Sequence, residues 1–176
     1  MKRIRLAVTA LAFVAIASPA LAQSVDGTRS GLARQNLVSA NPIGLLFEWY
    51  NAEFERAVSP TVSLAAAASS YNFDDATYAS VDGIVRYYPG ARALKGFSIG
   101  ASVGYIDIDE DEDECAFCTD DSGSSATLGV RADYVWILGR DQHLTAAAGI
   151  GAKRLFNNDL GTEGVPIGRL SIGWAW

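Results

Sequence analysis

The densest group of side chains that could bind a metal ion or react lies between residues 107 and 121, where nine carboxylates and two cysteines occur without a basic residue. Carboxylate oxygens are the ligands that hard cations such as Ca²⁺ and Mg²⁺ prefer. The run lacks EF-hand spacing, because the glycine needed for the sharp turn of that loop is missing. We expect either a solvated acidic loop or a weak Ca²⁺ or Mg²⁺ site, with no other cofactor. The residues that would hold the cation are Asp109, Asp111, Asp113 and Asp120.

The only cysteines of the chain, Cys115 and Cys118, form a Cys-x-x-Cys pair inside this acidic run. In a cytosolic protein that spacing would indicate a redox-active or metal-binding pair. In an exported chain, which meets an oxidising compartment, a disulfide is the expected state. A two-cysteine zinc site would lack partners, because the only histidine, His143, follows a turn at the opposite end of the predicted strands. We therefore predict a disulfide that pins the tip of the acidic loop.

A second set of charged side chains is dispersed along the chain but shares one face of its segments. Alternate residues of a β-strand point to opposite faces, and these charges alternate with apolar residues. Four acids and four bases balance one another, which is the condition under which charge is buried. We expect a structural polar network inside a barrel, with a proton or ion path as the alternative. The network consists of Glu53, Glu55, Asp82, Arg86, Arg131, Asp133, Lys153 and Arg169.

The elements that must position these residues are strands of about ten residues with alternating polarity, separated by turn signals. Helical periodicity is nearly absent from this part of the chain. Eight strands are expected rather than seven, because a closed antiparallel barrel needs its first and last strands antiparallel. The segments are 34–40, which is the weakest, 45–58, 62–71, 77–88, 97–105, 127–136, 144–153 and 166–176.

The segment 45–58 changes the phase of its apolar face near Tyr50 and Asn51. A one-residue β-bulge there would restore a single outward face, and a helical start to the segment is the alternative. The bulge would place Glu53 and Glu55 on the inner face. Before this segment, the residues 41–44 read Asn-Pro-Ile-Gly, which suits a type I turn.

The polarity of the two faces distinguishes a membrane barrel from a soluble one. The non-apolar face is mostly Gly, Ser, Thr and Ala with few charges, whereas a soluble exterior should be dense in Lys, Glu and Asp. We predict an all-β fold, an eight-stranded antiparallel up-and-down transmembrane β-barrel. Its narrow lumen is just wide enough for side chains to fill, which argues against an open pore. A soluble periplasmic ligand-binding barrel, of the lipocalin kind, is the alternative.

The N-terminus has the pattern of a secretory signal peptide. A basic start is followed by an apolar run and by the small-residue sequence Ala20-Leu21-Ala22, which predicts cleavage after Ala22. Removal of three basic residues takes the formal charge from −6 to −9. This acidic mature chain argues against nucleic acid as a partner. Residues 23–33 are predicted to be a periplasmic lead, and residues 34–176 the barrel.

The C-terminal strand ends the chain on an aromatic residue and carries one apolar, aromatic face. Aromatic residues of membrane barrels gather at the two interfaces of the bilayer. The strand resembles the terminal signal strand of bacterial outer-membrane β-barrels, which in that family is read by the barrel-insertion machinery. The residues on this face are Leu170, Ile172, Trp174 and Trp176.

Four stretches, at residues 41–47, 51–56, 86–89 and 96–100, resemble small outer-membrane barrel proteins of Gram-negative and related bacteria, in the architectural class of OmpX and the OmpA barrel. The resemblance covers roughly residues 36–176. It implies an outer-membrane monomer in contact with lipid and lipopolysaccharide, and it carries no catalytic residues. We expect a structural or surface-interaction role: envelope integrity, adhesion or weak cation binding.

An enzyme acting on lipid is the third hypothesis. Outer-membrane acyltransferases and deacylases of this size use a histidine with a serine and an acid near the outer rim. His143 is predicted at the opposite end, and no second histidine exists to serve as a general base. The sequence therefore favours a protein without catalytic activity.

Overall fold

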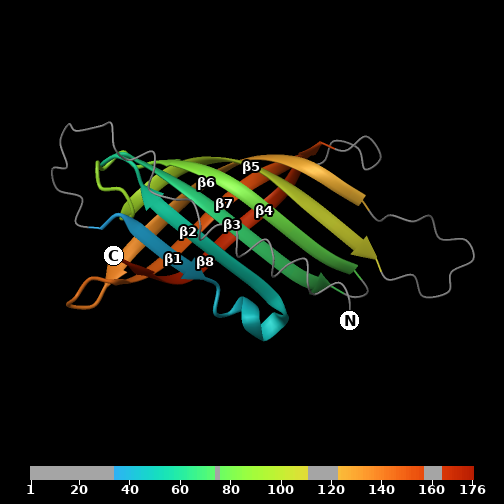
Figure 1. Ribbon diagram of the computed structural model, residues 1–176, viewed down its shortest axis with the longest axis horizontal. Coiled ribbons are helices and arrows are strands. Elements are labelled where there is room, and N and C mark those ends of the chain that lie inside the picture. Colours follow the sequence, from blue (N-terminus) through green and yellow to red (C-terminus); the bar gives the residue numbers. More distant parts are fainter. Residues whose placement is uncertain (1–33, 74–75, 111–122, 157–163) are drawn as a thin grey trace, which may run out of the picture. The chain divides into compact units, whose positions relative to one another are not determined.

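The computed structural model describes residues 34–73, 76–110, 123–156 and 164–176, which form eight antiparallel strands closed into a barrel (Figure 1). Each strand pairs with its sequence neighbours, and the first strand pairs with the last. The predicted eight-stranded up-and-down barrel is confirmed. No helix among these residues is long and apolar enough to cross a membrane. The strands are β1 (Asn36–Ala40), β2 (Trp49–Ala57), β3 (Val62–Phe73), β4 (Ala76–Tyr87), β5 (Gly96–Glu110), β6 (Gly123–Leu138), β7 (Leu144–Phe156) and β8 (Gly164–Ala175).

The polarity of the barrel is inverted relative to that of a soluble protein. Along β6, Leu128, Val130, Tyr134 and Trp136 are exposed on the outer face. Their strand neighbours point inward and are mostly small, polar or charged. The alternation in the sequence thus places apolar side chains outside and polar side chains inside, as predicted for a membrane barrel.

Closure of the barrel depends on its shortest strand. The strand β1 begins at Asn36, two residues later than predicted, and pairs with β8 from Leu37 opposite Ala175 to Ala40 opposite Ile172. The amides of Gln35 and Asn36 both donate to the carbonyl of Trp176, at 2.9 Å each. The predicted first strand is therefore present but limited to five residues.

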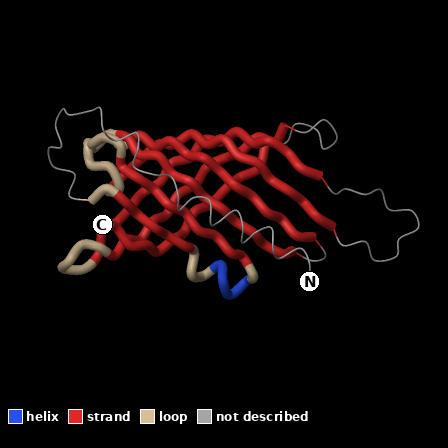
Figure 2. Tube along the Cα trace, in the orientation of Figure 1, coloured by secondary structure: helices blue, strands red, loops and turns tan. Residues whose placement is uncertain are grey.

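The predicted β-bulge in the second strand is wrong. Residues Gly44–Phe47 form a 3₁₀-helix, η3, and β2 starts only at Trp49 (Figure 2). The side-chain oxygen of Asn41 accepts hydrogen bonds from the amides of Ile43 and Gly44, at 3.1 and 3.0 Å, which tightens the turn leading into the helix. The phase change in the sequence therefore marks the passage from helix to strand, and β2 pairs with β3 in unbroken register.

Two strands extend further into the acidic region than predicted. The strand β5 continues to Glu110 and β6 begins at Gly123, so residues 107–110 belong to a strand rather than to a loop. Asp107 pairs with Ala79 on one side and with Ser124 on the other. The sequence did not reveal this extension, because Asp107 stands where the outward Val103 and Tyr105 predict another apolar residue.

A small apolar cluster lies at the end of the barrel that carries Ala175. Leu94, in the connection between β4 and β5, is buried against Leu37, Ala57 and Ala175. Its backbone has a φ of 66°, in the left-handed region that residues other than glycine seldom adopt. The amide of Ala93 donates to the carbonyl of Pro60 at 2.8 Å, so neighbouring turns are held together.

Candidate functional site

Arg86 is the centre of a charged cluster inside the barrel. The side chain is fully buried and makes ion pairs with three carboxylates from two other strands. Its nitrogens lie 2.8 Å from Glu53, 2.6 Å from Glu55 and 3.2 Å from Asp133. A guanidinium has five donors in a planar fork, and this geometry allows one side chain to connect β2 with β6.

Two further arginines complete the cluster. The Nε of Arg131 lies 2.8 Å from Asp133, and Nη2 of Arg169 lies 2.6 Å from Glu53. The same Arg169 nitrogen is 3.4 Å from the hydroxyl of Ser39 on β1. With three carboxylates and three guanidinium groups the cluster has no net charge. Neutrality and multiple hydrogen bonds are the conditions under which charges withstand burial.

Lys153 and Asp82 form a separate ion pair inside the barrel, with 2.5 Å between Nζ and Oδ2. Both side chains retain some exposure, and Oδ1 of Asp82 has no hydrogen-bond partner among the described residues. The eight residues of the predicted polar network therefore all face the interior, but they divide into a cluster of six and a pair. Sequence parity placed them on one face and could not assign partners.

Tyr88 and Ser63 belong to the cluster although the sequence analysis did not include them. Both hydroxyls donate to Oε1 of Glu55, and the Tyr88 bond measures 2.6 Å. Tyr88 follows the last residue of β4 and is fully buried beside the Glu55 carboxylate. The sequence did indicate that Tyr88 points inward, because it lies two residues after Arg86 and therefore on the same face of the strand.

Glycines make room for the charged groups. Gly100 stands between Arg86 and Arg131 in one row of paired residues, and a Cβ there would come within 3.1 Å of Arg131 and 3.2 Å of Arg86. A Cβ at Gly149 would collide with the carboxylate of Asp133. These glycines therefore set the space into which the arginines and carboxylates fit.

The only histidine lies away from the charged cluster. Nδ1 of His143 is 2.7 Å from the carbonyl oxygen of Ala175, and its ring stacks on Trp174 with 5.0 Å between centroids. Both contacts are at the end of the barrel where the chain terminates. The structure thus places His143 at the predicted end of the barrel, and His143 takes part in none of the described ion pairs of the cluster.

The predicted cation site falls largely outside the described residues. Asp109 lies in β5, whereas Asp111, Asp113, Asp120 and the cysteines Cys115 and Cys118 are in residues 111–122, which the structure does not describe. Among residues that it does describe, no group of three or more His, Cys, Asp or Glu side chains is arranged to hold a metal ion. The acidic loop and the disulfide stay predictions.

The terminal strand presents its aromatic face outward. Between adjacent strands, Trp174 pairs with Val38 of β1 and with Leu144 of β7. The outward side chains are about half exposed, whereas their neighbours in β8 contribute Arg169 and Ser171 to the interior. The exposed side chains are Leu170, Ile172, Trp174 and Trp176.

Comparisons with known proteins support the fold. No protein-family model and no curated protein sequence matches the chain. Among solved structures, it is similar to the N-terminal β-barrel domain of Pseudomonas aeruginosa OprF, with a TM-score of 0.52, 14% identity, and 81% of this chain and 98% of that chain covered. A second match, the Yersinia pestis outer membrane protein Ail in a phospholipid bilayer nanodisc, has a TM-score of 0.46 and 12% identity, with 81% and 99% covered. The resemblance to small outer-membrane barrels is confirmed at the level of the fold by OprF.

Proposed function

We propose that the chain is an outer-membrane barrel without catalytic activity, which has a structural or surface-interaction role. The observation that carries this proposal is the inverted polarity of the barrel. Its outer face exposes side chains such as Val130 and Ile150 to 63% and 76%, while its inner face buries Arg86 completely. Exposing a continuous apolar belt to water would promote association, and hydrocarbon removes that cost.

The inverted polarity also argues against the soluble periplasmic carrier. A soluble barrel that binds an apolar ligand would have an apolar interior and a charged exterior. Here the interior holds the ion pairs of Arg86 and the pair of Lys153 with Asp82. The strand order closes from β8 back to β1, which is the arrangement that a membrane barrel requires.

The filled interior favours a structural role over a pore. The charged cluster spans the lumen from β2 to β8, and the apolar cluster around Leu94 lies at one end of the barrel. An eight-stranded barrel has room for side chains and little else. A proton or ion path through this cluster would have to break ion pairs of 2.6 to 3.2 Å around Arg86.

The route to the membrane is part of the proposal. A signal peptide cleaved after Ala22 would export the chain, residues 23–33 would remain as a periplasmic lead, and the strand ending at Trp176 would be read by the barrel-insertion machinery. The mature monomer would then contact lipid and lipopolysaccharide. A disulfide between Cys115 and Cys118 and a weak Ca²⁺ or Mg²⁺ site at the acidic loop would act at the surface, where adhesion and envelope integrity are determined.

Fractionation with detergent tests the location. We expect the mature protein to stay with outer membranes after salt washing, to be extracted only by detergent, and to migrate faster on SDS gels before boiling than after. Recovery of the mature chain from the soluble periplasm would contradict the proposal. Single-channel recording in a planar bilayer tests the filled lumen, because large and steady currents would show that the polar cluster does not block it.

A further inference from the structure

Exposed basic and acidic side chains are segregated between the two ends of the barrel. One end, which we call the turn end, consists of the start of β1, the end of β8 and the strand ends joined by the turns 58–61, 88–95 and 139–143. Its outer surface carries one acidic side chain, Asp141, among the described residues, and five basic ones: Arg34, Arg56, Arg92, Lys95 and Arg140. The opposite strand ends and their connections hold fourteen carboxylates in sequence, at residues 48, 74–75, 107–121 and 157–163.

Backbone hydrogen bonds join the segments that carry the five bases. The segments 34–35 and 56–57 are linked by a bond of 2.8 Å, and the guanidinium of the first lies 3.5 Å from the carbonyl oxygen of Asp141. The turn 88–95 is linked to the turn 58–61 by bonds of 2.7 and 2.8 Å. Figure 2 shows the connections of this end around the C-terminus. The bases therefore share one continuous surface of the barrel.

This surface has no counter-charges of its own among the described residues. All of the ion pairs there lie inside the barrel, and none includes a base of the turn end. Arg56, Arg92, Lys95 and Arg140 are exposed, and Arg34 is half-buried. Five like charges on one surface create a positive potential that attracts anions from the surroundings.

Aromatic side chains indicate the depth of this surface in a bilayer. Aromatic residues of membrane barrels gather where hydrocarbon meets the lipid headgroups. Arg56 is an outward residue of β2 paired with Leu64, so it belongs to the wall of the barrel, and Lys95 is two residues from the outward Phe97. The basic side chains therefore lie at the level of the headgroups. The outward aromatic residues near the turn end are Tyr87, Phe97, Tyr134, Trp136, Trp174 and Trp176.

The chemistry of the five side chains suits a phosphate. Four are arginines, whose planar guanidinium donates two parallel hydrogen bonds to phosphate oxygens, and the fifth is a lysine, which acts as a point charge. A zwitterionic headgroup brings its own cation to the phosphate, whereas an anionic headgroup does not. A basic residue near an anionic membrane surface favours binding about fivefold. The turn end should therefore prefer anionic lipids.

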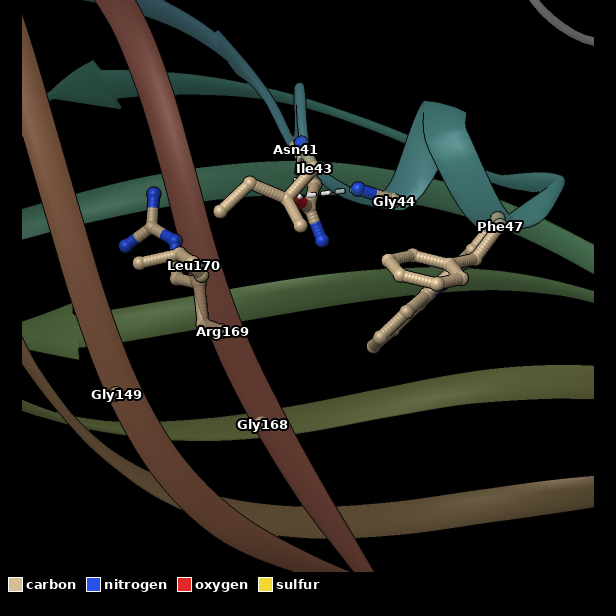
Figure 3. A pocket seen from close by; sticks show the side chains of 9 residues that line it. Asn41, Ile43, Gly44, Phe47, Gly149, Gly168, Arg169 and Leu170 are labelled. Carbon is tan, nitrogen blue, oxygen red and sulfur yellow. Dashed lines mark hydrogen bonds between the residues drawn. The ribbon is translucent and has the colours of Figure 1, made fainter.

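The groove in the barrel wall beside β8 offers no comparable charge to a headgroup. Figure 3 shows Ile43 and Phe47 on one side of this groove and Leu170 on the other. Arg169 also lines the groove, but its guanidinium is ion-paired with Glu53 at 2.6 Å. A preference among headgroups is therefore expected at the turn end rather than along this part of the wall.

We propose that the turn end binds anionic phospholipids of the periplasmic leaflet, whose phosphates accept hydrogen bonds from the five basic side chains. This inference rests on the proposed outer-membrane location, in which short turns face the periplasm. Anionic lipid is thereby gathered around one end of the barrel, and the carboxylates of the other end repel it.

Quenching of tryptophan fluorescence by brominated lipids tests the proposal. The chain is refolded into vesicles of phosphatidylcholine and phosphatidylglycerol, with bromine on the acyl chains of one lipid or the other. Trp49→Phe leaves Trp136, Trp174 and Trp176, near the turn end, as reporters. We expect phosphatidylglycerol to associate about fivefold more strongly than phosphatidylcholine. The preference should nearly vanish at about 1 M salt, where the Debye length is about 3 Å.

Three variants locate the preference on the barrel. Combining Arg56→Gln, Arg92→Gln, Lys95→Gln and Arg140→Gln should remove most of it. Replacing the same three arginines by lysine keeps the positive charge and should retain it. Arg154→Gln is the matched control, because it removes an exposed base near the opposite end of β7 and should leave the preference unchanged. If the fourfold variant does not regain fast migration on SDS gels, Arg92→Gln with Lys95→Gln replaces it and should lower the preference.

The outcomes separate this inference from the proposed location. Equal association of the two lipids with the parent, or an undiminished preference in the folded glutamine variant, would overturn the lipid site. The bases would then be left for a partner in the periplasm. If brominated phosphatidylcholine fails to quench the parent at all, the outward Trp136 and Trp174 are not in lipid, and the membrane location itself fails.

Discussion

Replacing Arg86 by methionine should destabilise the barrel more than any other single substitution of a charged interior residue. Arg86→Met keeps the length and apolar stem of the side chain but removes the guanidinium that pairs with Glu53, Glu55 and Asp133. Arg131 and Arg169 remain near Glu53 and Asp133, whereas Arg86 is the cation paired with Glu55. The variant therefore leaves the fully buried carboxylate of Glu55 without a counter-charge.

The size of the effect follows from burial. Removing one partner of a buried ion pair costs about 3–5 kcal/mol, because the other charge is left uncompensated. Adding Glu55→Gln should restore neutrality while keeping a side-chain oxygen for the hydroxyls of Tyr88 and Ser63. We expect the double variant to be about 1.5–3 kcal/mol more stable than Arg86→Met alone, since replacing both charges of a pair is often nearly neutral.

The measurement is reversible unfolding by denaturant from phosphatidylcholine vesicles, with the free energy of unfolding obtained by linear extrapolation. Lys153→Met is the matched control, because its pair with Asp82 is partly exposed and should cost less. A loss below about 1 kcal/mol for Arg86→Met would mean that water reaches the cluster and screens it. A double variant whose loss equals the sum of the two single losses would refute the argument from neutrality.

Three further predictions follow from the contacts described above. Gly149→Ala should cost about 1–3 kcal/mol in unfolding free energy, since the new methyl group meets the Asp133 carboxylate, whereas Gly90→Ala, in open space, should change it little. Tyr88→Phe should cost about 1–3 kcal/mol by leaving the buried Glu55 short of a donor, and Tyr87→Phe on the outer face should be nearly neutral, both measured by the same unfolding assay. Thiol titration of the native protein should find no free thiol from Cys115 or Cys118, and two free thiols would exclude the disulfide.

Much of the fold could be predicted from the sequence because a strand has a period of two. Parity alone assigned Asp82, Arg86 and Arg131 to the interior and Leu128 and Trp136 to the outer face. The even number of strands that antiparallel closure requires also predicted eight strands rather than seven. These properties depend only on neighbours along the chain, so a single sequence carries them.

The partners inside the barrel could not be predicted in the same way. The tilt and stagger of the strands determine which side chains meet across the lumen. The alternation of residues within one strand gives no information about either. Arg86 reaches Glu55, 31 residues away, and Asp133, 47 residues away, and no local pattern connects them. The burial of Leu94 was also missed, since a turn is expected to face water and this one folds into the barrel end.

The sequence favoured a β-bulge over the 3₁₀-helix because the residues of the helix alternate as those of a strand would. Leu45 and Phe47 share one parity, as strand residues would, but Leu46 between them is 80% exposed as well. The turn formed by Asn41 commits the backbone to a helical path before β2 begins. Side-chain hydrogen bonds to the backbone therefore outweighed the alternation, as they often do next to turns.

The contacts of Arg169 have a consequence for the order of assembly. Every hairpin of the barrel joins strands that are near in sequence, but β1 and β8 meet only after the two ends of the chain have found each other, across four residue pairs. Contacts between such distant residues form slowly, because the loop they close is long. Arg169 bonds Ser39 across 130 residues and Glu53 across 116, so it links β8 to β1 and β2 at this junction. The polar contacts of Arg169 thus hold the closing strands together. Arg169→Gln should therefore raise the unfolding rate of the closed barrel more than it lowers the rate at which the hairpins form.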